Sequence, residues 1–209
     1  NQAYMKKIIS LFAFVFLLGE VPDAQSLLPM PRNYEHAYNN GTRSATGRPG
    51  DKYWQNHATY NIQVNFSPTT RIISGAEEVV YTNNSPDTLE QVWFKLYPNL
   101  YQQGVQRDLA LNAADVGEGV RIEGVMIDDK TVSDESVRIN GTNMQVATKS
   151  ILPGEKVKFN IHFSYILNKT SHTRTGMVDE ESAFIAYFFP RIAVYDDVDG
   201  WNRIPYQGT

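Results

Sequence analysis

The sequence of 209 residues is 42% hydrophobic and 20% charged, has no cysteine and carries a formal net charge of −4 at pH 7. Its length allows one domain or two small ones, and its composition is that of a soluble globular protein. The negative charge argues against nucleic-acid binding, which needs a concentrated basic surface. The lack of cysteine excludes disulfides, thiol nucleophiles and cysteine-ligated zinc.

The first residues have the features of an export signal. Met5-Lys6-Lys7 is a short basic segment, and the mostly apolar run of residues 8–18 follows it. A basic head, an apolar run and a small residue at the cut are typical of a secretory signal peptide. The run is too short to cross a membrane, which takes about 20 residues. We therefore expect residues 1–24 to be a signal peptide with extraneous leader residues before Met5, cut after Ala24. The mature chain, starting at Gln25, would be periplasmic or secreted.

Residues 25–51 have the composition of a connecting segment. They include Pro29, Pro31 and Pro49 and the turn-forming sequence Asn39-Asn40-Gly41, and they show little hydrophobic periodicity. We therefore expect a linker or a loosely draped arm here, followed by one folded domain over residues 52–209.

The first strands of that domain follow from alternation and turn residues. Apolar and polar residues alternate from 60 to 66, which predicts a strand with one wet face. A second strand is expected over residues 71–82, ended by the turn Asn83-Asn84-Ser85-Pro86-Asp87. Residues 89–97 are the most apolar strand candidate, so we expect that strand to lie centrally in a sheet with both faces covered.

The middle of the chain contains an ambiguous segment and a hairpin. Residues 100–116 predict an irregular excursion with a short helix, and strand character resumes over residues 120–127. Asn140-Gly141 lies between two alternating runs, which is the strongest short-range indication of a hairpin. Pro153-Gly154 predicts a further turn.

The clearest strand covers residues 157–165. Its apolar side chains occupy alternate positions and are expected to line the buried face of a sheet: Val157, Phe159, Ile161, Phe163 and Tyr165. No repeat of fixed period is present, so a solenoid or propeller is not expected. Short strands with turns about every ten residues predict an all-β fold, a curved double-sheet or saddle-shaped sandwich of antiparallel and mixed strands.

Motifs for catalysis are missing from the sequence. The four histidines, His36, His57, His162 and His172, stand in unrelated contexts, and none belongs to an H-E-x-x-H helix. His162 falls on the polar positions of its strand, where a solvated surface histidine is expected. There is also no G-x-S-x-G elbow and no phosphate-binding or dinucleotide-binding glycine loop. The sequence thus predicts neither catalytic residues nor metal ligands in this chain.

One acidic segment resembles part of a calcium-binding loop. Residues 196–202 read Asp-Asp-Val-Asp-Gly-Trp-Asn, and alternating carboxylates can converge on one cation. The full spacing and the terminal bidentate glutamate are absent, so an Asp-rich turn is the favoured interpretation.

Three blocks of sequence look familiar together. They are Tyr53-Trp54-Gln55-Asn56, residues 79–101 (VVYTNNSPDTLEQVWFKLYPNLY) and residues 183–208 (AFIAYFFPRIAVYDDVDGWNRIPYQG). They resemble the N-terminal β domain of aminopeptidase N-like zinc metallopeptidases (metallopeptidase family one, gluzincins), in the form common in Bacteroidetes-type bacteria. The resemblance covers about residues 53–209.

The resemblance implies a role beside a catalytic domain. In this family the N-terminal domain is a β saddle that packs against a thermolysin-like domain, which holds one zinc through H-E-x-x-H and a downstream glutamate. The chain contains no such segment, so the zinc is expected in a catalytic domain beyond residue 209, and this portion alone is expected to be inactive and zinc-free. The implied partners are that catalytic domain and a peptide substrate with a free N-terminus.

The resemblance also assigns one substrate-binding residue. In the family a loop of the N-terminal domain touches the substrate's N-terminal residue, and Glu181, nine residues before Pro190, matches that contact. Family members often have glutamine there. A carboxylate beside the substrate amine would favour its ammonium form. The alternative for Asp179-Glu180-Glu181 is a solvated acidic loop.

Two other functions remain open at this point. One is a non-enzymatic exported β-sandwich for adhesion or glycan binding, with exposed Tyr and Trp side chains as ligand platforms. The other is a family member that kept the architecture and lost its zinc. An H-E-x-x-H motif in the gene beyond residue 209 would favour the peptidase, and a stop codon or a broken motif the alternatives.

Overall fold

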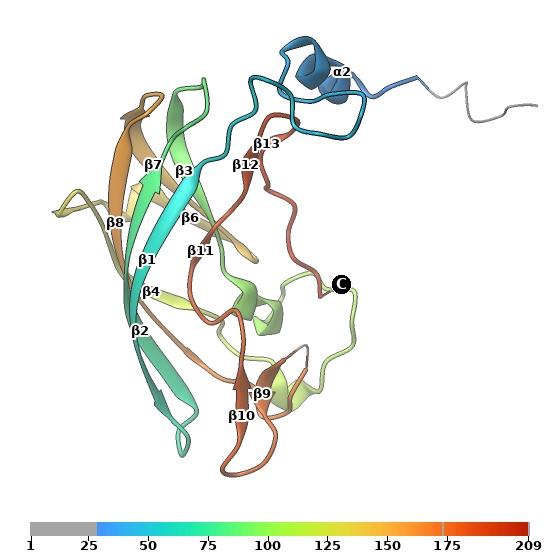
Figure 1. Ribbon diagram of the computed structural model, residues 1–209. Helices are drawn as coiled ribbons and strands as arrows, with labels where there is room; N and C mark the ends of the chain where they lie inside the picture. The colour runs from blue at the N-terminus through green and yellow to red at the C-terminus, as the bar shows by residue number, and fades with distance from the viewer. Residues whose placement is uncertain (1–28, 173, 209) are drawn as a thin grey trace, which may run out of the picture.

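The computed structural model describes residues 29–172 and 174–208. The expected signal peptide and its cleavage site lie outside the described residues. Figure 1 shows two layers of strands, with a short helix and an extended arm at one end. The all-β prediction is confirmed. Within the described ranges, no helix is long and apolar enough to cross a membrane.

The larger layer is a five-stranded antiparallel sheet. Its strand order is β1-β2-β8-β4-β5. The bounds are β1 His57–Ser67, β2 Ile72–Thr82, β8 Lys156–Ile166, β4 Arg121–Ile127 and β5 Lys130–Thr131. The expected strands near residues 60–66, 71–82, 120–127 and 157–165 all lie here.

The second layer is a four-stranded sheet in the order β11-β3-β7-β6. The bounds are β11 Arg191–Ile192, β3 Leu89–Lys95, β7 Asn143–Ile151 and β6 Val137–Asn140. β3 has neighbours on both sides, as its apolar sequence predicted. Pairings between named strands are antiparallel throughout the described residues, and an isolated bridge between Gln102 and Gly117 is parallel.

The remaining elements are short. Two small ladders join β9 (Thr175–Met177) to β10 (Ala183–Ile185) and β12 (Tyr195–Asp196) to β13 (Gly200–Trp201). The helix α2 covers Arg32–Asn39, and three 3-10 turns cover Tyr97–Tyr101, Ala113–Asp115 and Asp134–Ser136. The turn at Ala113–Asp115 lies in the segment 100–116 that was expected to be irregular with a short helix, and the turn at Tyr97–Tyr101 overlaps the start of that segment.

The core lies between the two sheets. All five apolar residues predicted to face inward on β8 are buried, which confirms the predicted register. Phe159 meets Phe94 of the opposite sheet edge to face, with ring centroids 5.4 Å apart. Such contacts add about 0.5–1.5 kcal/mol beyond the area that they bury.

Gly75 on β2 lies directly under an aromatic ring of β8. A Cβ at this position would be 2.7 Å from Cζ of Phe163 and 3.1 Å from the backbone oxygen of Gln63. No side chain fits there unless Phe163 moves. The missing side chain leaves room for the large Phe163 ring, which is 1% exposed.

A carboxylic acid lies within this apolar core. Glu77 shares the inward face of β2 with Ile73, Val79 and Tyr81 and is 2% exposed. Its partners in register are Ile62 on β1 and Ile161 on β8. Neither carboxyl oxygen has a hydrogen-bond partner among the described residues, and burial raises the pKa of Glu77 to about 9. The side chain is therefore protonated at neutral pH.

The predicted β6–β7 hairpin is present, but its turn is shifted by one residue. Asn140 pairs with Asn143, so the two turn residues are Gly141 and Thr142 rather than Asn140 and Gly141. Gly141 has a φ of +54°, and Thr142 has a negative φ. A glycine at the first central position with positive φ is the preference of a type II′ turn.

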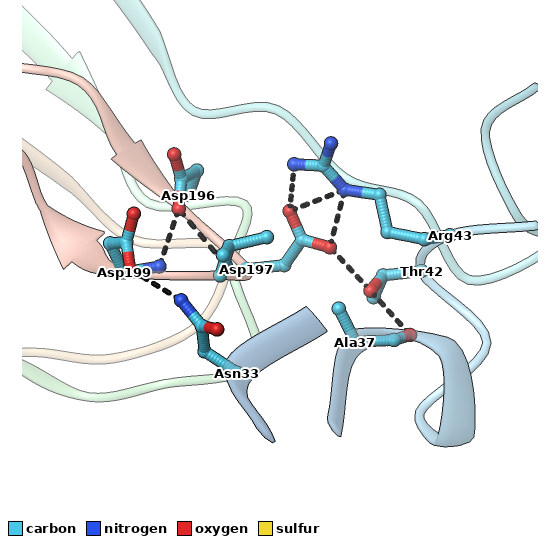
Figure 2. Close-up of polar contacts among 8 residues, drawn as sticks. Asn33, Ala37, Thr42, Arg43, Asp196, Asp197 and Asp199 are labelled. Carbon is cyan, nitrogen blue, oxygen red and sulfur yellow. Dashed lines mark hydrogen bonds and ion pairs between the residues drawn. The ribbon is translucent and has the colours of Figure 1, made fainter. Parts of the chain in front are cut away.

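The arm over residues 29–56 is more ordered than the sequence predicted. It contains α2, whose Ala37 is fully buried, where a linker or a loosely draped arm was expected. Arg43 donates two hydrogen bonds to Asp197 of the β12–β13 hairpin, from Nε to Oδ2 (2.9 Å) and from Nη2 to Oδ1 (2.7 Å). The Thr42 hydroxyl donates to the same carboxylate. Figure 2 shows this two-pronged contact, which fastens the arm to the sandwich.

Candidate functional site

Glu181 lies in the turn of the β9–β10 hairpin. Ala183 pairs with Met177 and Ile185 pairs with Thr175, which leaves residues 178–182 as the loop. The backbone N–H of Val178 donates to the Ser182 oxygen at 2.8 Å and closes the loop. Glu181 is thus exposed on this loop, and Figure 1 shows the β9–β10 hairpin at the lower end of the molecule.

Asp179 holds the turn in its conformation. Its Oδ1 accepts hydrogen bonds from the backbone N–H groups of Glu181 (2.9 Å) and Ser182 (2.7 Å). These donors lower the pKa of Asp179, because they stabilise its ionised form. The backbone at Glu181 is therefore fixed, while its side chain points into solvent without a polar contact among the described residues.

The base of the hairpin is anchored to the end of β8. The Asn168 side chain donates to the Thr175 oxygen at 3.2 Å, and the Met177 N–H donates to the Asn168 oxygen at 3.1 Å. Asn168 and Met177 are buried, whereas Val178 and Phe184 are 56% and 55% exposed. The hairpin is thus a firmly rooted projection with an acidic tip and apolar flanks.

The chemistry available at this tip is electrostatic. Asp179, Glu180 and Glu181 are all exposed, and none of them forms an ion pair with a described cation. A carboxylate in open water attracts an ammonium group only weakly, by about 0–1 kcal/mol. Selective binding of an amine by Glu181 would require a second surface that removes water from the pair.

The three sequence blocks that look familiar together are in direct contact. The Asn56 side chain accepts hydrogen bonds from the backbone N–H groups of Asn84 (2.7 Å) and Ser85 (3.0 Å), and it donates to the Tyr81 hydroxyl. Asn84 in turn donates to the Gln55 oxygen. The first block is therefore tied to the turn within the second.

The third block closes the same unit. The Tyr195 hydroxyl donates to Asp87 at 2.7 Å, and the Tyr195 ring stacks on Trp54 with centroids 5.7 Å apart. The backbone N–H of Ile192 donates to the Tyr60 hydroxyl at 3.0 Å. Segments that are distant in sequence thus form one contiguous piece of the structure.

The histidines do not come together. His57 and His162 are exposed on the larger sheet, and His36 lies in α2. Nε2 of His172 is 3.9 Å from Oδ2 of the buried Asp115, which also accepts from the Thr170 N–H at 2.9 Å. In the part of the chain that the structure describes, no three His, Asp or Glu side chains are placed to hold a metal ion. These residues do not fit a zinc site.

The acidic segment 196–202 forms a turn whose carboxylates have protein partners. Asp196 accepts from the N–H groups of Val198 and Asp199, Asp197 binds Arg43, and Asp199 accepts from Asn33. Figure 2 shows the Asp197 carboxylate turned toward Arg43, away from the carboxylates of Asp196 and Asp199. The favoured interpretation, an Asp-rich turn, describes this arrangement.

The comparisons with known proteins give a partial structural likeness. An M1 zinc metallopeptidase variant from Deinococcus radiodurans matches with a TM-score of 0.37 and 10% identity, over 58% of this chain and 23% of that chain. A variant of that description bound to a Tyr-Ser-Ala substrate matches with a TM-score of 0.38 and 10% identity, over 59% and 23%. A two-domain M1 zinc metallopeptidase variant bound to L-tryptophan matches with a TM-score of 0.38 and 10% identity, over 64% and 25%.

The chain spans about a quarter of the length of these solved structures. No protein-family model matches the sequence, and no curated protein sequence matches it.

Proposed function

We propose that this chain is the N-terminal, substrate-cleft domain of an exported zinc-dependent aminopeptidase-like metallopeptidase. The observation that carries the proposal is the contact network among the three blocks that resemble the aminopeptidase N family. Asn56, Asn84 and Tyr195, one from each block, belong to that network. A single domain built from the three blocks requires such contacts among them.

The catalytic chemistry would lie in a separate domain of the complete protein. A zinc ion held there by H-E-x-x-H and a further glutamate would polarise the peptide carbonyl and activate a water molecule. The β domain of this chain would then form one wall of the substrate cleft. Export would follow from the signal peptide expected over residues 1–24.

Within that arrangement Glu181 would bind the free amine of the substrate. The β9–β10 turn holds its backbone in place, and its carboxylate is unpaired among the described residues. Closure of the catalytic domain over the tip would remove the water that otherwise screens the pair. A desolvated carboxylate would then favour peptides with a charged N-terminus over blocked ones.

The test uses the complete gene product and two peptides, one with a free amine and its N-acetylated counterpart. We expect one zinc per protein and turnover of the free-amine peptide that a chelator abolishes. Glu181→Ala should lower kcat/KM for that peptide at least about tenfold, since removing one partner of a desolvated charge pair commonly costs about 2–5 kcal/mol. The melting temperature should not change, because the side chain lies on an exposed loop.

Glu180→Ala is the matched control, because Glu180 is an exposed neighbour in the same turn. It should keep near wild-type kcat/KM. A complete protein without zinc or peptidase activity would contradict the proposed function. An active enzyme in which Glu181→Ala behaves like Glu180→Ala would contradict only the role given to Glu181.

A cleft beside the arm favours glycan binding as a second candidate function. It has a volume of about 810 Å³, and its lining includes Trp54, Tyr195, Asn84, Asp87 and Asp196. Aromatic faces beside amides and carboxylates suit the apolar faces and hydroxyl groups of sugars. Saturable quenching of tryptophan fluorescence by maltotriose or chitotriose, lost in Trp54→Ala, would support this candidate over the peptidase domain.

A further inference from the structure

Lys95 is a buried cation without an anionic partner. It lies at the end of β3 on the face of the second sheet that points away from the core, and it is 6% exposed. Its Nζ donates to Oδ1 of Asn143 at 2.8 Å and to the backbone oxygen of Ile204 at 2.7 Å. Both acceptors are neutral, and the ion pairs formed among the described residues do not include Lys95.

This environment is costly for an ammonium group. Burial lowers the pKa of Lys95, because no nearby carboxylate offsets the loss of water. An ammonium group has three N–H donors, and the two acceptors leave one of them without a protein partner. Buried charges are normally paired, so an uncompensated one beside a cavity is where an anion would bind most favourably.

Two further cations lie on the same face. Arg191 on β11 is the register partner of Lys95, so their side chains project to the same side of the sheet. The guanidinium carbon of Arg203 lies 6.0 Å from the ring centroid of Trp93. None of the three cations forms an ion pair within residues 29–172 and 174–208. This face therefore carries three cations without ion-pair partners, although the chain as a whole has a net charge of −4.

A pocket opens next to Lys95. It has a volume of about 310 Å³, and its walls include Tyr97, Asn202, Pro205, Tyr206 and Gln207. The rings of Tyr97 and Tyr206 meet edge to face at 5.1 Å. Its volume is at the lower end of the range for small-molecule sites. A ligand that fits would have an anionic end for Lys95 and a small apolar body for the aromatic wall.

Hydrogen bonds to the backbone of residues 203–207 fix one wall of the pocket. The Asn143 side chain donates to the Arg203 oxygen at 2.7 Å, and the Tyr206 N–H donates to the Thr142 hydroxyl at 2.7 Å. The Gln207 oxygen accepts from the Asp108 N–H at 3.0 Å. Residues 203–207 are thus fastened across the ends of β3 and β7, so a ligand would meet a preformed wall.

We propose that this pocket binds a small organic carboxylate, whose carboxylate accepts the remaining N–H of Lys95 while its apolar body lies against Tyr97 and Tyr206. The proposal concerns the outer face of the second sheet and does not depend on the proposed peptidase function. Binding would compensate the buried charge and would raise the pKa of Lys95, since a neighbouring anion favours the ammonium form.

The test titrates the chain with 3-phenylpropionate and with its neutral analogue 3-phenylpropionamide, using isothermal calorimetry. We expect saturable one-to-one binding of the acid and at least about tenfold weaker binding of the amide, as hydrogen bonds to charged groups are the stronger ones. In parallel, NMR titration of the Lys95 side chain should show a higher pKa at saturating acid. Inorganic phosphate at the same concentration should not displace the acid, because it lacks the apolar body.

Two variants make the assignment specific. Lys95→Met should abolish preference for the acid over the amide. Gln207→Glu keeps both hydrogen bonds of Lys95 and adds a carboxylate at the wall, so it should weaken binding of the acid at least about tenfold even if Lys95→Met does not fold. Equal affinity for acid and amide, wild-type affinity in Gln207→Glu, an unchanged Lys95 pKa or displacement by phosphate would each overturn the proposal.

Discussion

Replacing Glu77 by glutamine should remove a large pH dependence from the stability of this domain. Glu77 is 2% exposed in the core, and its pKa is raised from 4.5 to about 9. Between these values the folded state keeps a proton that the unfolded state has lost. The folded state therefore binds more protons, and stability must fall as the pH rises through this window.

The expected magnitude follows from the width of the window. Each pH unit inside it is worth about 1.4 kcal/mol for one proton, so from pH 5 to pH 8 the wild type should lose about 4 kcal/mol relative to Glu77→Gln. This is a large part of the 5–15 kcal/mol by which domains are typically stable. At pH 5 the two proteins should differ little, since a protonated glutamic acid and a glutamine have nearly the same shape and neither is charged.

Urea unfolding followed by tryptophan fluorescence at four pH values from 5 to 8 measures the effect. All other titrating groups are common to both proteins and cancel in the difference. Glu78→Gln is the matched control, because Glu78 points to the opposite face of β2 and is more exposed. It should keep the wild-type pH dependence. Parallel stability profiles for wild type and Glu77→Gln would refute the argument, since they would mean that the carboxyl group is solvated or paired.

Two further changes test the packing and the arm. Ile161→Ala should lower the unfolding free energy measured in urea by about 2–5 kcal/mol, because Ile161 is fully buried. Asn160→Ala on the outer face should change it by no more than about 0.5 kcal/mol. Equal losses would mean that the register of β8 is wrong. Arg43→Ala should cost about 1–2 kcal/mol, a modest value because Arg43 is 36% exposed, and should speed amide exchange in residues 29–56. Arg43 lowers the pKa of Asp197 to about 2. The wild type should therefore be more stable than Arg43→Ala at neutral pH, and this difference in unfolding free energy should disappear as the pH falls from about 4 toward 2. A difference that persists below pH 2 would contradict this assignment.

The strands were the most predictable part of the fold. The alternation over residues 157–165 predicted which side chains face inward. β8 pairs with β2 and β4, and a shift of its register by one residue would turn its apolar side chains away from the core. The hairpin at Asn140-Gly141 was predicted, but its turn moved by one residue to Gly141-Thr142. Gly141 is the one residue of this turn that needs a positive φ. The local sequence does not reveal whether Asn140 or Thr142 is the other central residue of the turn, because the pairing of the two strands decides this.

The helix α2 could not be predicted from local sequence. Eight residues form a marginal helix in isolation, and this one depends on buried Ala37 and on the nearby Arg43–Asp197 contact. Those two partners are 154 positions apart in the sequence. Tertiary contacts of this length leave no trace in periodicity or composition.

The residues of the candidate sites also differ in how far the sequence could predict them. The position of Glu181 on a loop was predicted, and its binding role stays a prediction. Lys95 and Glu77 were not singled out, because charged residues in strands were expected to face solvent. A clue was present for Glu77, which has the same parity as Ile73 and Val79 in an alternating strand. For Lys95 there was none, since its cover comes from Ile204, 109 positions away.

The close contact between Gly75 and Phe163 has a consequence for how this domain can evolve. Since a Cβ at position 75 would lie 2.7 Å from the ring, a larger residue there is best tolerated after the ring at position 163 has been replaced by a smaller one, because otherwise the ring must move. The reverse order is passable, because a smaller residue at 163 leaves a cavity that a side chain at 75 could then fill. Substitutions at the two positions are therefore coupled, and a smaller residue at 163 is expected to come before a larger one at 75. Across distant relatives they should covary in size while their summed volume stays nearly constant.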